Sequence, residues 1–364
     1  MTAPTAPTTT VSAGGPLPTG FTVADLTWVS DTQGWALGTA PCSHPPCTSV
    51  AHTLDGGRTW AGLPAPVAYL ESPGSPACST TVACVRGIRF ADANTGYVFG
   101  ANSLWLTTNG GHTWTRRGTD DTSSLEIGAG TVTRATAGTC TPPGCPYQVQ
   151  ATSVGATSWQ SLSTPVMTGV GAMVAMDGTN RYVAVFQNTA GGAQDAHTRL
   201  ARSVDGGAHW ATFADPCGVT PGGNEADATT ISAAPGGSVA VACNSRASGG
   251  AAFVVLSADA AATFGPHRAN LLPTVPPDGD HVDHIAAATG QRLAVTVASL
   301  TAGTTSIAVS NDAGIDWTVT TSQPGGGAVF LGFEDAETGR AVIQPRTVLT
   351  TTDGGGHWAT FTFP

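Results

Sequence analysis

Apolar residues in this chain occur in short runs separated by turn-forming residues, and no long stretch repeats them at helical spacing. Residues 182–186 and 251–256 are typical runs, with the length and composition of buried strands. The 47 Gly and 25 Pro residues punctuate the chain between such runs. No apolar run approaches the length of a membrane span. The pattern predicts an all-β protein built from many short strands.

One eight-residue pattern, Ser/Thr-x-Asp-x-Gly-x-x-Trp, returns seven times along the chain. The second copy has Asn for Asp, the fifth lacks the Gly and the Trp, and the third keeps only the Thr and the Trp. The closing aromatics are 41 to 54 residues apart, a period typical of an array of supersecondary units. The copies occupy residues 53–60, 107–114, 152–159, 203–210, 257–264, 310–317 and 351–358.

Each position in this pattern has a mechanical explanation. An Asp or Asn at the start of a turn accepts hydrogen bonds from nearby backbone N–H groups, and a Gly tolerates a positive φ. The Trp then returns the chain as a strand and covers the turn. Each copy resembles the Asp-box, or BNR repeat, of sialidase-type β-propellers, where it joins the third and fourth strands of a blade. The resemblance implies structural roles, on the face away from any active site, for Asp55, Asn109, Asp205, Asp259, Asp312, Asp353, Trp60, Trp114, Trp159, Trp210, Phe264, Trp317 and Trp358.

A second pattern, an Asp followed by a Gly and then usually an aromatic residue, precedes several of these copies, as at residues 31–35, 92–97 and 335–340. It matches the turn between the first two strands of a blade. Together the two patterns are similar to the photosystem II assembly-factor propellers and the sortilin-type propellers. The resemblance implies one all-β domain, a seven-bladed β-propeller of four-stranded antiparallel blades. A flexible Thr/Ala/Pro-rich linker at 1–20 would precede blades at about 21–63, 64–117, 118–165, 166–214, 215–266, 267–321 and 322–364.

Eight cysteines fall into four close groups, and an even count in local pairs is typical of disulfides. We expect the pairs Cys42–Cys47, Cys78–Cys84, Cys140–Cys145 and Cys217–Cys243. Zinc is the alternative ligand of such clusters, but no CxxC spacing is present.

The compartment follows from this cysteine usage, because disulfides persist in oxidising compartments. We therefore expect an extracytoplasmic protein, secreted or anchored at the cell surface. Residues 1–20 are too polar for a signal peptide, so an export signal or membrane anchor is expected upstream. A natural flexible N-terminus is the alternative explanation.

The charge of the chain bears on its partners. The net charge is −10, and all 14 basic residues are Arg, which favours a GC-rich bacterial genome as the source. An acidic chain without a basic cluster is a poor match for nucleic acid. No cofactor motif is present, so we expect a monomer that binds no cofactor and no nucleic acid.

In the propeller arrangement, all four cysteine pairs map to the face opposite the Asp-box turns. Stapled loops there would hold a binding surface, or would simply keep long exposed loops ordered. The polar candidates for ligand binding on this face are His197, Arg246, Arg268, His281, His284 and Arg346.

Residues 278–284 gather two His and three Asp residues, a composition that suits a divalent metal. In an extended strand, however, Asp280 and His284 share one side, while His281 and Asp283 share the other. We therefore expect a solvated loop without a metal there, and a divalent-metal site at these four residues is the alternative interpretation.

A sialidase needs three arginines, a Tyr–Glu pair and an acid/base Asp. The chain lacks the Arg-Ile-Pro motif of that family; the nearest string, residues 87–90, has another order and lies in a strand. Other glycosidases of this scaffold use a carboxylate pair, for which Asp227, Asp280 and Asp283 are the candidates. We predict a non-catalytic binding or scaffold module for a protein or cell-surface glycan. The alternative is a glycoside hydrolase, exo-sialidase-like or of another Asp-box type, with two carboxylates within about 10 Å in the central pocket.

Overall fold

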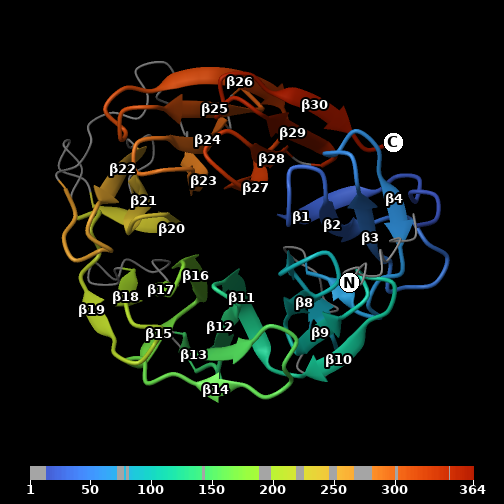
Figure 1. Cartoon of the computed structure of the whole chain (residues 1–364), viewed down its shortest axis with the longest axis horizontal. Coiled ribbons are helices and arrows are strands. Elements are labelled where there is room, and N and C mark those ends of the chain that lie inside the picture. The colour runs from blue at the N-terminus through green and yellow to red at the C-terminus, as the bar shows by residue number, and fades with distance from the viewer. Residues whose placement is uncertain are drawn as a thin grey trace, which may run out of the picture.

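The chain forms a ring of antiparallel sheets around a central axis, the seven-bladed β-propeller expected from the repeats (Figure 1). The structure is a computed structural model that describes residues 14–71, 78, 82–141, 144–187, 198–218, 225–245, 252–265, 281–299, 302–343 and 345–364. The described residues form strands and turns, and none of them belongs to a helix that could cross a membrane.

Each blade takes its strands consecutively from the chain, beginning with the strand nearest the axis. Blade one has β1 (Thr22–Trp28), β2 (Gly34–Thr39), β3 (Thr48–Thr53) and β4 (Ala61–Leu63). Blade two has β7 (Gly87–Phe90), β8 (Gly96–Gly100), β9 (Ser103–Thr107) and β10 (Thr115–Gly118). Blade three has β11 (Asp121–Gly128), β12 (Thr131–Ala137), β13 (Cys145–Ser153) and β14 (Gln160–Ser161), and β15 (Met167–Gly169) also pairs with β13.

The remaining blades follow the same order. Blade four has β16 (Gly171–Asp177), β17 (Asn180–Phe186), β18 (Arg199–Ser203) and β19 (Ala211–Phe213). The described part of blade five has three strands, β20 (Ala226–Ala234), β21 (Ser238–Ser245) and β22 (Ala252–Ser257). Blade six has β23 (His281–Ala287), β24 (Leu293–Ser299), β25 (Thr304–Ser310) and β26 (Thr318–Pro324). Blade seven has β27 (Ala328–Phe333), β28 (Gly339–Ile343), β29 (Thr347–Thr351) and β30 (Ala359–Thr362), and a short parallel pair, β5 (Tyr69–Leu70) and β6 (Cys84–Val85), links blades one and two.

The hydrophobic core is itself a ring, because each of its seven clusters lies between two neighbouring blades. Between blades one and two, for example, Trp35 and Leu37 pack with Ile88 and Phe90. The rings of Trp35 and Phe90 stack with centroids 3.7 Å apart. A blade buries both of its faces only when both neighbours are present, so the apolar runs specify the whole ring rather than single sheets.

The eight-residue repeats, called repeat turns from here on, share one hydrogen-bond pattern in six of seven copies. In the first, Thr53 Oγ1 lies 2.9 Å from Asp55 Oδ1, which also accepts from the Thr59 N–H at 2.9 Å. The Thr53 hydroxyl accepts from the N–H of Gly57 at 3.0 Å. Gly57 has a φ of 86°, which explains the preference for Gly there. The third copy lacks the acid, and its Thr152 bonds Ser158 O instead.

In six of the seven blades, a backbone N–H of the repeat turn donates to the turn between the first two strands of the same blade. The N–H of Gly56 donates to Thr32 O at 2.9 Å, and that of Gly354 donates to Glu337 O at 2.7 Å. Both kinds of turn therefore lie on one face of the ring, called the repeat-turn face. The connections between second and third strands, and those between blades, lie on the opposite side, called the loop face.

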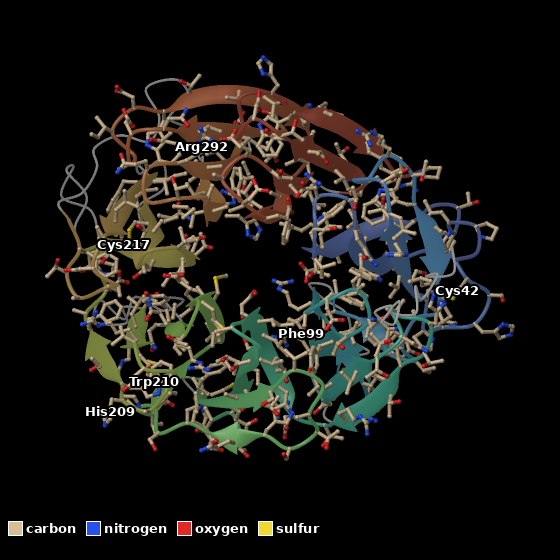
Figure 2. The ribbon with its side chains drawn as sticks, in the orientation of Figure 1. Cys42, Phe99, His209, Trp210, Cys217 and Arg292 are labelled. Atoms are coloured by element: carbon tan, nitrogen blue, oxygen red, sulfur yellow. A yellow bond between two sulfur atoms is a disulfide. The ribbon has the colours of Figure 1, made fainter. Side chains whose placement is uncertain are left out.

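The four disulfides form with the predicted pairing, and all of them lie at the loop face. Cys42–Cys47 and Cys140–Cys145 close the connections between second and third strands in blades one and three. Cys217–Cys243 is fully buried and ties the entry of blade five to its second strand (Figure 2). No described cysteine is free.

The ring closes by contact between blades one and seven. Phe363, after the last strand, packs edge-on against Phe21 with ring centroids 4.9 Å apart, and both side chains are buried. The Gly20 N–H donates to Pro364 O at 3.0 Å. Among the residues before β1, Gly15 exchanges two backbone hydrogen bonds with Gly62 of outer strand β4, within blade one.

The closure contact predicts a large loss of stability when Phe363 is truncated. Replacing a buried Phe by Ala costs about 3–5 kcal/mol, so F363A should lower the free energy of unfolding by that amount in urea titrations. F213A, in outer strand β19 and only partly buried, is the matched control and should cost less. Equal losses for both variants would show that Phe363 does not hold the seam.

The repeat turns predict acid sensitivity. Hydrogen bonds from the Thr263 backbone N–H, the Thr263 hydroxyl and Ser257 lower the pKa of Asp259 to about 2. Because its folded pKa is depressed, Asp259 stabilises the fold above its ordinary pKa of 3.8, and this contribution disappears as the pH falls towards 2.

The variant D259N should keep the turn, because Asn109 accepts the same backbone bond from Thr113 in the second copy. Its thermal midpoint should fall less between pH 5 and pH 2 than that of the wild type. Parallel pH curves would contradict the prediction.

Candidate functional site

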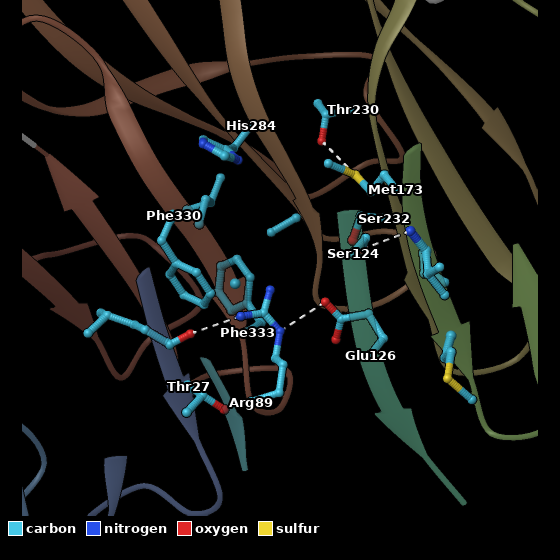
Figure 3. A pocket seen from close by; sticks show the side chains of 18 of the residues that line it. Thr27, Arg89, Ser124, Glu126, Met173, Thr230, Ser232, His284, Phe330 and Phe333 are labelled. Atoms are coloured by element: carbon cyan, nitrogen blue, oxygen red, sulfur yellow. Dashed lines mark hydrogen bonds and ion pairs between the residues drawn. The ribbon is translucent and has the colours of Figure 1, made fainter. Parts of the chain in front are cut away.

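A central cavity of about 510 Å³ lies on the axis of the ring. All seven inner strands line it, mainly with the halves that lead into the repeat-turn face. The sequence predicts the central pocket on the loop face, whereas this cavity lies nearer to the repeat-turn face. Figure 3 shows charged, polar and aromatic side chains facing one another across it.

Three charged side chains from three consecutive blades form a triad on the cavity wall. Arg89 of β7 places Nη1 2.7 Å from Asp25 Oδ2 of β1 and Nε 3.0 Å from Glu126 Oε1 of β11 (Figure 3). Asp25 also accepts backbone N–H bonds from Leu26 at 2.9 Å and Ile88 at 2.8 Å. One guanidinium thus joins two carboxylates, and the triad ties blades one, two and three together.

The environment of the triad shifts all three pKa values upward. Burial raises the pKa of Glu126 and of Asp25, although the charge of Arg89 opposes both shifts. Burial disfavours the charge of Arg89, but the two carboxylates together raise its pKa above the ordinary value. The side chain of Glu126 remains 30% exposed to the cavity, against 11% for Asp25.

A second acid, Glu334, lines the cavity just after β27. Its Oε2 lies 3.7 Å from Nη1 of Arg340, a buried side chain that also covers the ring of Trp28 at 4.3 Å. Burial raises the pKa of Glu334 to about 8 in spite of that neighbour. Arg340 Nη2 donates to Asp31 O at 2.9 Å, so this group joins blade seven to blade one.

The rest of the cavity wall is apolar or carries uncharged polar groups. Phe330 and Phe333 of blade seven and Met173 of blade four supply apolar surface, while Ser124 and Thr230 supply hydroxyl groups (Figure 3). The cavity wall therefore has one charged region, at the triad, next to a larger apolar region.

The predicted His/Asp group is divided by the fold. His284 lines the cavity, half-buried, and burial lowers the pKa of its imidazole. Asp283 turns toward blade seven, where Oδ2 accepts from the Ala328 N–H at 2.9 Å and Oδ1 lies 2.8 Å from His281 Nε2. β23 bulges between Val282 and His284, so the simple alternation of sides assumed from the sequence fails there.

The other predicted site residues do not gather at the cavity. Asp227 of β20 lies opposite Asn244 of β21. Arg346 lies at the loop face, where its carbonyl oxygen accepts from the Phe363 N–H beside the contact between blades one and seven. Neither lines the cavity, and Asp283 and His281 do not either. The remaining candidates fall outside the described residues: His197, Arg246, Arg268 and Asp280. Among the described residues, no group of three or more His, Cys, Asp or Glu side chains is placed to hold a metal ion.

The sequence analysis missed Asp25, Arg89, Glu126 and Glu334. Asp25, Arg89 and Glu126 each sit among apolar neighbours inside a short strand, as in Leu125-Glu126-Ile127. An isolated charge in an inner strand of a propeller faces either the axis or the next blade, and this was the available signal.

No family model matches this sequence, and no curated protein is similar to it at a significant level. Solved structures are similar in fold. YCF48 bound to D1 peptide aligns with a TM-score of 0.60 at 16% identity, covering 95% of this chain and 99% of that one. A PL25 ulvan lyase aligns at 0.58 and 9% identity, covering 97% of both chains. An ancestral GH74 enzyme aligns at 0.59 and 13% identity, covering 96% of this chain and 48% of the enzyme.

The triad predicts a stability defect that depends on pH. Replacing Arg89 by Met leaves two largely buried carboxylates unpaired, which should cost about 3 kcal/mol at pH 7. Acids whose folded pKa is raised lose stability as the pH rises, so the deficit of R89M should shrink toward pH 4. R199M removes an exposed Arg of β18 and is the matched control in urea titrations. A deficit independent of pH would contradict the ion-pair explanation.

Proposed function

We propose that this protein is a non-catalytic binding propeller that recognises a protein partner through its loop face. The observation that carries the proposal is the pairing of the cavity acids. Asp25 and Glu126 share Arg89, and Glu334 lies beside Arg340. Carboxylates paired in this way join neighbouring blades and are poorly placed to act on a substrate.

The rival function is glycoside hydrolysis, and one arrangement favours it. Asp25 and Glu126 bond the same guanidinium, so two carboxylates lie close together on the cavity wall, as a glycosidase requires. Such enzymes need one protonated acid and one carboxylate free to attack the sugar or activate water. Arg89 occupies the space between the two and favours the ionised form of both, which argues against that chemistry.

The loop face has features of a partner surface. Four disulfides fix its connections. Val166 and Val170, in the segments that flank β15, are 74% and 52% exposed, and Val67 before β5 is 73% exposed. Ordered loops with exposed aliphatic groups lose little entropy when a partner binds.

A protein partner is favoured over a glycan. Sugar sites commonly present exposed aromatic faces, and all nine Trp residues of this chain are at least partly buried. Among proteins with this fold, YCF48 has been solved bound to D1 peptide, which shows that such a propeller can bind a polypeptide. The disulfides support a location outside the cytoplasm.

The proposal predicts that charge on the loop face abolishes partner binding. The double variant V166D/V170D should lose at least tenfold in affinity, because each new carboxylate would have to be desolvated at the interface. The matched control is V204D/I315D, which places the same charges on two exposed aliphatic residues of the repeat turns. Partners cross-linked to the oxidised wild type would be identified by mass spectrometry and titrated against both variants.

The same preparations would be assayed on a polysaccharide panel for new reducing ends and for unsaturated uronates. We expect neither product. Turnover that disappears in E126Q would establish the hydrolase instead. Equal loss of binding in both double variants would refute the assignment to the loop face.

A further inference from the structure

We propose that the central cavity binds an organic cation, an alkylammonium or alkylguanidinium group on an apolar stem, with its charged head at Glu126. This site is separate from the loop face and goes beyond the partner-binding proposal. The cavity volume, about 510 Å³, lies within the usual range for small-ligand pockets.

The balance of charge on the wall selects the sign of the ligand. Asp25 and Glu126 share the single guanidinium of Arg89, so one negative charge is left over in the triad. Glu334, with its pKa of about 8, is largely protonated at pH 7 and adds little charge to the wall. Arg340 does not line the cavity, because its side chain is 1% exposed and covers the ring of Trp28. In a partly dry cavity this excess attracts a cation and repels an anion more strongly than it would in water.

The hydrogen bonds show where the head would bind. Asp25 already accepts two backbone N–H bonds in addition to the bond from Arg89. Glu126 accepts through Oε1 from Arg89 Nε, and no described group donates to its Oε2. An ionised carboxylate has about four acceptor positions, so Glu126 retains capacity for a donor in the cavity. Its 30% exposed side chain makes that capacity accessible.

The apolar part of the wall supplies the complement to a stem. Phe330 and Phe333 lie beside the triad on blade seven, and Met173 faces it from blade four (Figure 3). Aromatic faces and a thioether accommodate methylene groups and also attract a nearby cation. A small inorganic cation would leave this surface unused, whereas an alkyl cation would cover it.

The test uses three probes with one stem and different heads: n-hexylammonium, n-hexanol and n-hexanoate. Titration calorimetry of the full chain at pH 7 should give n-hexylammonium a dissociation constant below about 1 mM. Its affinity should exceed that of n-hexanol at least tenfold, and n-hexanoate should show no binding. Equal or tighter binding of hexanoate, or no binding of any probe at about 10 mM, would overturn the proposal.

Variants locate the head. E126Q preserves the shape of the side chain and removes its charge, so it should lower hexylammonium affinity about tenfold, to the level of hexanol. E337Q, which removes an acid paired with Arg292 on the repeat-turn face, is the matched control and should leave affinity unchanged. Unaltered binding by E126Q would reject this site.

A last pair of probes separates two sources of the cation. A capped pentapeptide with a central Lys is compared with the same peptide carrying norleucine. Selective binding of the Lys peptide would identify a basic side chain of a polypeptide as the ligand. Binding of hexylammonium without the Lys peptide would identify a small free amine.

Discussion

The ring depends on how the backbone groups on the free edges of its seven inner strands, which face the central axis, find hydrogen-bond partners. Each inner strand pairs on one side only, so backbone N–H groups on the other edge need acceptors. Oxygen atoms of side chains in the preceding blade supply several of them. The pairs run from donor to acceptor as Ile88 to Asp25, Phe90 to Thr27, Ala172 to Ser123, Val174 to Ser124, Val282 to Asn244, Ala287 to Ser232, and Ala328 to Asp283.

These bonds explain why charged side chains lie in the channel although few of their oxygen atoms are free to bind a ligand. Asp25 bonds the backbone of blade two and at the same time positions Arg89. Asp283 likewise accepts a backbone bond from blade seven, at the Ala328 N–H, while it pairs with His281. Asp25 lines the channel because blades one and two meet there, whereas Asp283 bonds its neighbouring blade without lining the cavity. The apolar clusters between the blades hold that geometry. Any ligand of the cavity must therefore use capacity that the ring leaves over, as at Glu126.

The repeats predicted the architecture because each copy encodes a local hydrogen-bond set that survives substitution. The fifth turn keeps the bonds of the others although Ala261 replaces the Gly, at a φ of 60°. Three of the cysteine pairs were predictable for the same local reason, because their members are 5 or 6 residues apart, whereas Cys217 and Cys243 are 26 residues apart. The triad was not, because it joins residues from three blades. Inner strands also bulge near their starts, for example between Val23 and Asp25, and each bulge reverses the simple alternation of faces.

Closure by contact has a topological consequence. Every described blade is built from one continuous stretch of chain, and no described strand is exchanged between blades one and seven. The two ends of the ring nevertheless meet, with the Gly20 nitrogen 3.0 Å from the Pro364 oxygen. The linear order of the blades is therefore one of several ways to cut the same circle. A circular permutant joined across this seam and opened at an exposed repeat turn would keep every contact between blades.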